Sequence, residues 1–118
     1  MTENFQPGAK AQALVAFSTV NNHESAQKIA HELIQQHLAA CVNIVPGVES
    51  IYFWDNDVCE DNELLLIIKT TTANIEKTKE ILPQIHPYKV PELVFLPVVN
   101  GLSDYLNWIF EVTEKNDG

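Results

Sequence analysis

The chain of 118 residues contains no arginine and few basic residues of any kind: seven lysines stand against 16 acidic residues. Arginine is the usual residue for bidentate contacts to phosphates and base edges. Its absence and the net charge of −9 argue against a nucleic-acid partner. The same charge disfavours binding to anionic membrane surfaces. No apolar run reaches the roughly 18 residues of a membrane-spanning helix.

The first ten residues lack the basic start and the apolar segment of a signal peptide, so we expect a cytoplasmic protein. Cysteine is scarce as well. Cys41 and Cys59 form no CxxC pair, which provides neither a disulfide framework nor zinc-ligand spacing. No glycine-rich phosphate loop, nucleophilic-serine motif or zinc-protease motif is present, so we expect a protein that is not an enzyme. Its length predicts one domain over residues 11–118, preceded by a flexible tail over residues 1–10.

The apolar pattern predicts alternating strands and helices. Asn21 and Glu24 resemble a capping box for a helix whose apolar stripe begins at Ala26. Pro46-Gly47 predicts a bulge or bend within the second strand, and Asp55-Asn56-Asp57 a tight turn after it. Pro83 should end or kink the second helix. The expected elements are strands over 12–20, 40–54, 63–70 and 93–99, and helices from about 22, from 72 to 85 and from 103.

The element order, β-α-β-β-α-β with an extra C-terminal helix, predicts an α+β, ferredoxin-like fold in which two helices cover one face of an antiparallel sheet. The residues from Leu64 to Ile68 run without a polar break. A strand with one wet face should alternate apolar and polar residues, so this run predicts that both faces are covered. The second cover would come from other copies of the chain in a closed cyclic oligomer.

Four segments in order, LAACVNIVPGVESIYFW, ELLLIIKT, HPYKVPEL and YLNW, resemble the CutA family of divalent-cation tolerance proteins. The likeness extends from about Ala13 to Ile109. It implies a homotrimer of ferredoxin-like subunits, similar in architecture to PII signalling trimers. It also implies a cytoplasmic role in copper tolerance without an established reaction. The trimer core is then expected at Leu64, Leu66, Ile67 and Ile68.

Copper or another divalent cation is the only cofactor that the resemblance implies. Some family members are thought to bind copper at positions that are Ser18, Ile85 and His86 here, so one imidazole remains. Imidazole binds copper and zinc well, and a thiolate binds soft Cu(I), which makes His86 and Cys41 the candidate ligands. The alternatives are that His86 packs at a subunit boundary and that Cys41 is a small buried hydrophobe.

Polar residues at the ends of the apolar strands need partners. Lys69 and Glu92 could face each other as a buried ion pair, or belong to a ligand-binding cleft between subunits. The cleft would suit a signalling or scaffold trimer that binds a small molecule or a protein. Five acids near the hairpin tip could attract a hard cation, although a solvated, charge-protected hairpin is favoured. The expected cleft residues are Trp54, Glu63, Lys69, Tyr88 and Glu92.

Overall fold

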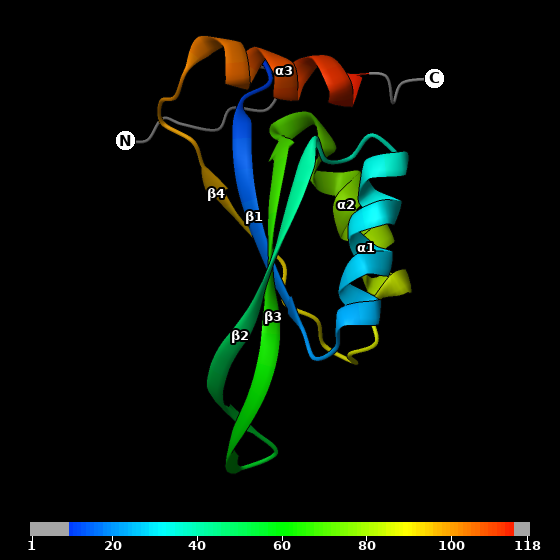
Figure 1. Ribbon diagram of the computed structural model, residues 1–118, viewed down its shortest axis with the longest axis vertical. Coiled ribbons are helices and arrows are strands. Elements are labelled where there is room, and N and C mark those ends of the chain that lie inside the picture. Colours follow the sequence, from blue (N-terminus) through cyan, green and yellow to red (C-terminus); the bar gives the residue numbers. More distant parts are fainter. Residues whose placement is uncertain (1–9, 115–118) are drawn as a thin grey trace.

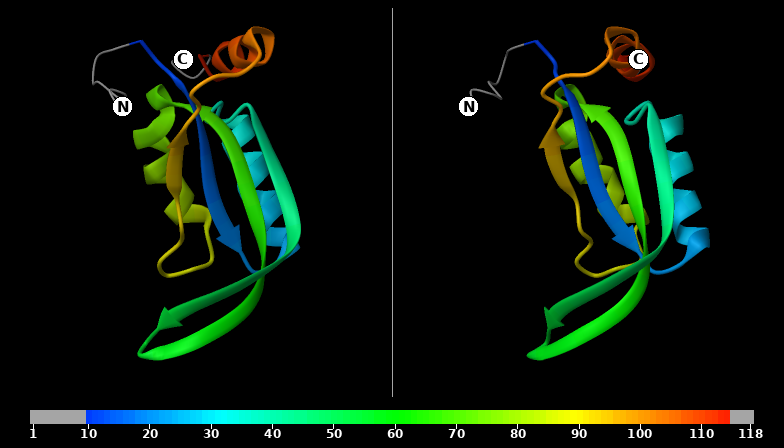
Figure 2. Two further views of the ribbon diagram at one scale, coloured as in Figure 1. Left: turned by 90° about the vertical axis from the view of Figure 1, so that its left-hand side faces the viewer. Right: turned by 60° about the vertical axis from the view of Figure 1, so that its left-hand side comes forward.

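The computed structural model describes residues 10–114, so the expected flexible tail, apart from Lys10, lies outside the described residues. A four-stranded antiparallel sheet in the order β2-β3-β1-β4 forms one layer. Helices α1 and α2 cover one face, and α3 lies across one end of the sheet (Figures 1 and 2). The elements are β1 (Ala13–Val20), α1 (His23–Gln35), β2 (Cys41–Trp54), β3 (Asp57–Thr71), the short 3-10 helix η1 (Thr72–Asn74), α2 (Ile75–Ile85), β4 (Val94–Pro97) and α3 (Ser103–Thr113).

The α+β fold and the order of its main elements are as the sequence predicts, with local differences. The cap of α1 is Asn22, not Asn21: its side chain accepts a 2.7 Å hydrogen bond from the Ser25 amide because it directly precedes the first helical residue. Strand β4 is shorter than expected and ends at Pro97, which cannot donate to a sheet ladder. None of the helices between residues 10 and 114 has the length and apolarity that a bilayer crossing requires.

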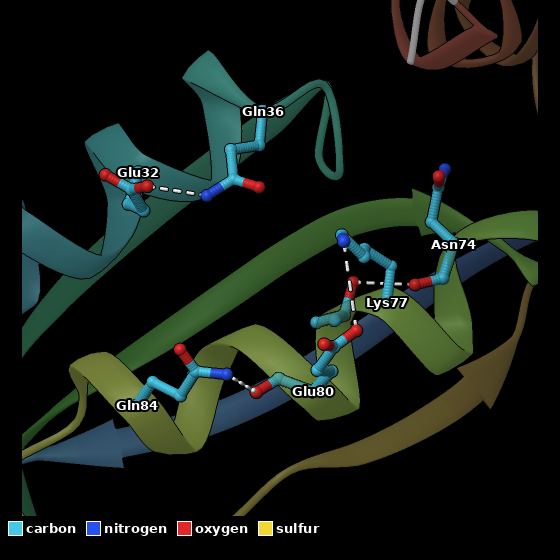
Figure 3. Close-up of polar contacts among 7 residues, drawn as sticks. Glu32, Gln36, Asn74, Lys77, Glu80 and Gln84 are labelled. Atoms are coloured by element: carbon cyan, nitrogen blue, oxygen red, sulfur yellow. Dashed lines mark hydrogen bonds and ion pairs between the residues drawn. The ribbon is translucent and has the colours of Figure 1, made fainter. Parts of the chain in front are cut away.

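Helix α2 continues past Pro83 and ends at Ile85, in agreement with the expected end near the proline. The proline has no N–H, so the helix loses the backbone hydrogen bond that residue 83 would donate to the carbonyl of Lys79. The side chain of Gln84 donates to the carbonyl of Glu80 at 3.0 Å, and at the C-cap of α1 the side chain of Gln36 donates to the carboxylate of Glu32 at 2.6 Å (Figure 3). Both contacts stabilise the C-terminal ends of the helices that cover the sheet.

The apolar run of β3 divides between two faces of the sheet. Leu66 and Ile68 are fully buried in a cluster that includes Leu33 and Leu82 of the covering helices, and Leu64 packs against it. The assignment of Leu64, Leu66 and Ile68 to a trimer core is therefore corrected. Side chains alternate along a strand, so these three belong to the core of the chain itself.

The opposite face of the sheet is apolar and partly exposed, and we call it the open face. Ile67 of β3 stands there. Phe17 of β1 is the cross-strand partner both of Ile67 and of Val94 in β4. Val45, Val94 and Leu96 remain 38%, 47% and 41% exposed. The apolar residues of the open face are Val15, Phe17, Val45, Leu65, Ile67, Val94 and Leu96, and the polar residues Thr19, Cys41, Asn43 and Lys69 stand on the same side.

Strands β2 and β3 extend beyond the rest of the sheet as a twisted two-stranded arm (Figure 1). The predicted bulge lies at its base: pairing shifts between Val45 and Val48, and Gly47 adopts a φ of 78° that favours glycine. At the tip, Asp55 and Asn56 have φ values of 56° and 66°, which confirms the predicted tight turn.

Candidate functional site

A cavity of about 390 Å³ lies at the base of the arm, and we call it the arm cavity. The end of β1, the two strands of the arm and the loop between α2 and β4 form its walls. The bulge decides which side chains of β2 belong to it. One extra residue reverses the alternation of a strand relative to its partner, so Tyr52 and Trp54 stand on the same side of the arm as Asp61 and Glu63. The lining residues are Thr19, Asn21, Ser50, Tyr52, Trp54, Asp61, Glu63, Tyr88, Lys89, Val90 and Glu92.

Glu63 is the buried carboxylate of this cavity, with only 7% of its surface exposed. The Tyr88 hydroxyl donates to its Oε2 at 2.5 Å. Burial and this hydrogen bond to a carboxylate raise the pKa of Tyr88 well above its usual value of 10. The phenol therefore keeps its proton, and remains a donor, throughout the neutral and mildly alkaline range.

A second phenol and carboxylate pair lies further along the arm. The Tyr52 hydroxyl donates to Asp61, and this hydrogen bond, with smaller contributions from burial and nearby negative charge, raises the pKa of Tyr52 to about 12. Glu92 approaches from the loop, where its Oε1 is 3.4 Å from the hydroxyl of Thr19. Acidic and aromatic groups thus both line the cavity.

His86 fastens the loop to the sheet. Its Nδ1 accepts a hydrogen bond of 3.1 Å from the Tyr88 amide, which assigns the ring proton to Nε2 and makes Nε2 the donor to the Thr19 carbonyl at 2.9 Å. The ring also meets the Tyr88 ring edge-on, with centroids 4.7 Å apart. Burial lowers the pKa of His86 below its usual value of 6.5. The histidine therefore holds Tyr88 in position over the cavity.

The two predicted metal ligands do not form a shared site. A metal ligand needs a nitrogen lone pair, and the lone pair of His86 Nδ1 is occupied by the Tyr88 amide. Cys41 lies at the start of β2 opposite Lys69, whose Nζ is 4.0 Å from its sulfur. Over residues 10–114, no three or more histidine, cysteine or acidic side chains converge in a way that could hold a metal ion. The residues therefore do not fit a copper site within one described chain.

The prediction that Lys69 lines the cleft is wrong for the arm cavity. Its ammonium donates to Asn43, and it does not line the arm cavity, so it does not face Glu92. The physical reason is distance along the strand, because Lys69 and Glu63 are separated by most of the length over which β3 pairs with β1. The cavity does include Trp54, Glu63, Tyr88 and Glu92.

The sequence did not identify Tyr52 as a site residue, and it placed Asp61 only among the five acids of the hairpin tip. The signal that could have found them is the alternation of Ser50, Tyr52 and Trp54 after the bulge. This alternation places three polar or aromatic side chains on one side of the strand. Their partners on β3 depend on the register of the hairpin, which the two-residue turn sets.

The fold and the site define an α+β protein with one open apolar sheet face and an acidic, aromatic cavity beside it. A sequence profile described as "CutA1 divalent ion tolerance protein" matches residues 14–112. The "Divalent-cation tolerance protein CutA" of Thermus thermophilus is 52% identical over 84% of this chain and 96% of its own length. The chain belongs to the CutA1 divalent ion tolerance family.

Other relatives support the same assignment. The "Protein CutA, chloroplastic" of Arabidopsis thaliana is 45% identical over 87% of the chain, which spans 57% of that longer protein. The solved structure of CutA from Xylella fastidiosa has a TM-score of 0.84 at 35% identity, covering 86% of this chain and 98% of its own. The Thermus thermophilus structure has a TM-score of 0.80 at 50% identity, covering 82% of this chain and 94% of its own.

Proposed function

We propose that the protein is a cytoplasmic, non-enzymatic homotrimer that supports tolerance to divalent cations, copper in particular, through weak or indirect metal binding. The observation that carries the proposal is the family match across residues 14–112. In the proposed assembly each subunit is ferredoxin-like and the trimer resembles PII proteins in architecture. Since His86 and Cys41 are not brought together within the chain, the proposed metal response does not depend on the two acting as a pair.

The open face supports the trimer. Apolar side chains of all four strands stand on it, and several are more than one-third exposed in the isolated chain. Monomeric soluble proteins rarely leave a large contiguous apolar patch in water. The arm adds a second patch, where Ile51, Phe53 and Val58 are 64%, 68% and 69% exposed. A closed cyclic arrangement would cover both patches with other copies of the chain. Sedimentation at low micromolar concentration should give about three times 13.3 kDa.

Growth assays at increasing copper concentrations test the proposed role in copper tolerance. Deleting the gene from its host should lower the copper concentration that the cells tolerate, and the wild-type gene should restore it. A Cys41→Ser variant, with a Cys59→Ser variant as its matched control, tests whether the thiol contributes. Equal tolerance with and without the gene would contradict the proposal.

Direct binding is measured separately by calorimetry with Cu(II), Cu(I) and Zn(II). Weak binding should give a saturable heat that the Cys41→Ser variant reduces for Cu(I), because thiolates prefer soft ions. A tolerance phenotype without any heat of binding would assign the role to an indirect mechanism.

The arm cavity favours a second candidate function, a signalling or scaffold trimer that binds a small molecule. Its volume of about 390 Å³ falls within the usual range for ligand sites, and it combines aromatic walls with a few polar groups. A thermal-shift screen with nucleotides and metabolites should then show a rise in Tm that depends on ligand concentration. A flat response across the screen would rule this candidate out.

A further inference from the structure

The chemistry of the arm cavity is acidic and aromatic. Its carboxylates are Asp61, Glu63 and Glu92, and Lys89 is the single cationic side chain among the lining residues. Trp54 and the two tyrosines described above supply the aromatic part of the wall. An anionic ligand would meet net negative charge here, whereas a cation would be attracted both by the carboxylates and by the faces of the rings.

Glu63 has unused hydrogen-bonding capacity that faces this space. The Tyr88 hydroxyl occupies Oε2, and Oε1 has no hydrogen-bond partner among residues 10–114. The side chain is nevertheless only 7% exposed, and the surface it retains belongs to the cavity lining. Oε1 is therefore open to the cavity, where a ligand can reach it, and a cationic donor forms a stronger hydrogen bond to a carboxylate than a neutral one does.

A divalent metal ion suits this set of groups poorly. Hard divalent cations require several oxygen ligands arranged around one point, and no such convergence of three acidic side chains exists over residues 10–114. The Tyr52 and Tyr88 hydroxyls also occupy carboxylate oxygens that a metal would need. An ammonium group needs only one or two acceptors, and its alkyl chain can pack against aromatic rings.

We propose that the arm cavity binds a small alkylammonium ion, whose N–H donates to Glu63 Oε1 while its alkyl chain packs against Trp54 and Tyr52. This inference rests on the second candidate function and names the chemical class of its ligand. His86 has a positioning role in it, because it holds the Tyr88 amide and so keeps the Tyr88 hydroxyl on Glu63.

The test follows the two indole N–H signals of the full-length protein by NMR during titration with n-butylammonium chloride. The sequence has two tryptophans, and a Trp54→Phe variant assigns their signals. The Trp54 signal should shift saturably, and the Trp108 signal, from α3, should not. The neutral isostere 1-butanol should bind at least about tenfold more weakly, since it lacks the charge that Glu63 attracts. Tetramethylammonium, which cannot donate a hydrogen bond, should lie between the two.

Matched variants locate the interaction. Glu63→Gln should weaken n-butylammonium binding about tenfold, whereas Glu49→Gln removes the same charge from the arm outside the cavity lining and should change it less than about twofold. If Glu63→Gln fails to fold, Glu92→Gln replaces it, with an expected loss of about threefold.

The proposal is overturned by equal affinity for n-butylammonium and 1-butanol, or by equal effects of the Glu49 and cavity substitutions. ATP and Mg²⁺ are titrated in parallel. Saturable ATP binding without amine binding would refute the ligand class and leave the second candidate function standing. A saturable shift of the Trp54 signal with Mg²⁺, without amine binding, would instead make the cavity a metal site. A Trp54 signal that responds to none of these ligands, together with a flat thermal-shift screen, would refute both the inference and that candidate function.

Discussion

Substitutions at two adjacent positions of β3 should affect different properties: Leu66→Ala should lower the stability of the chain, and Ile67→Asp should prevent its association. Leu66 is fully buried beneath the helices, among residues such as Leu33 and Leu82. Ile67 is half-buried on the open face. Because consecutive side chains of a strand point to opposite faces, a single step along β3 leads from the core of the chain to the proposed subunit contact.

The magnitudes follow from these environments. Truncating a core leucine to alanine costs about 2–5 kcal/mol, and the complete burial of Leu66 among fully buried neighbours places it near 4 kcal/mol. At about 4 °C per kcal/mol for a domain of this size, Tm should fall by about 15 °C. Ile67→Asp should cost an isolated chain only about 1 kcal/mol of lost apolar burial. In a subunit contact the same carboxylate would be a buried ion, which costs about 3–5 kcal/mol at each contact when it has no partner. Lys69, on the same face and bound to Asn43 opposite position 67, is the one nearby cation among the described residues that could offset part of this cost.

The assay combines sedimentation velocity with thermal unfolding by circular dichroism, at one fixed protein concentration because association shifts apparent stability. Leu66→Ala should keep the wild-type mass and unfold at a lower temperature. Ile67→Asp should remain folded and sediment near 13.3 kDa, and Ile67→Val, which retains an apolar side chain, should behave as the wild type. The reasoning is refuted if Ile67→Asp sediments like the wild type, or if Leu66→Ala leaves Tm unchanged.

Three further changes test local contacts. Burial lowers the pKa of His86 below 6.5, so on acidification the unfolded chain binds a proton at a higher pH than the folded chain does. The free energy of unfolding should therefore fall as the pH drops below about 6.5. Urea titrations across pH 5–7 should show a shallower decline for a His86→Gln variant. Asn56→Gly should raise the free energy of unfolding by about 0.5–1 kcal/mol, since Asn56 adopts a φ of 66°; an unchanged urea midpoint would contradict this. Thr70→Val should cost about 1–3 kcal/mol by the same assay, because it leaves the buried Leu38 carbonyl without the 2.6 Å hydrogen bond from Oγ1.

The elements of the fold were predictable because their signals are local. The stripe through Ala26, Ile29 and Leu33 is fully buried, as its helical spacing indicates. The interruption of β2 at Pro46-Gly47 is a bulge for the reason that the sequence gives, namely that proline donates no ladder bond and glycine accepts a left-handed φ. In each case a few neighbouring residues determine the result.

The face of each side chain was less predictable. The run from Leu64 to Ile68 shows that both faces of β3 are apolar, but it does not say which residue faces the helices. That depends on the pairing with β1, where Leu66 stands opposite Ser18, and therefore on contacts between distant parts of the chain. Lys69 was assigned to the cleft for the same reason, because its position relative to distant strands was not known from the sequence. In the structure it stands beside Cys41, near the C-terminal end of β3.

The open face and the arm cavity are continuous, which connects the proposed assembly to the proposed ligand. Glu63 and Ile67 stand on the same side of β3, and Thr19 of β1, which lines the cavity, pairs with Leu65 between them. A second copy of the chain seated on the open face would therefore lie beside the cavity. A ligand that binds the assembled form more tightly than the single chain must strengthen association by the same factor. If the ligand has such a preference, occupancy of the cavity and the oligomeric state are linked equilibria, and a change in one should shift the other.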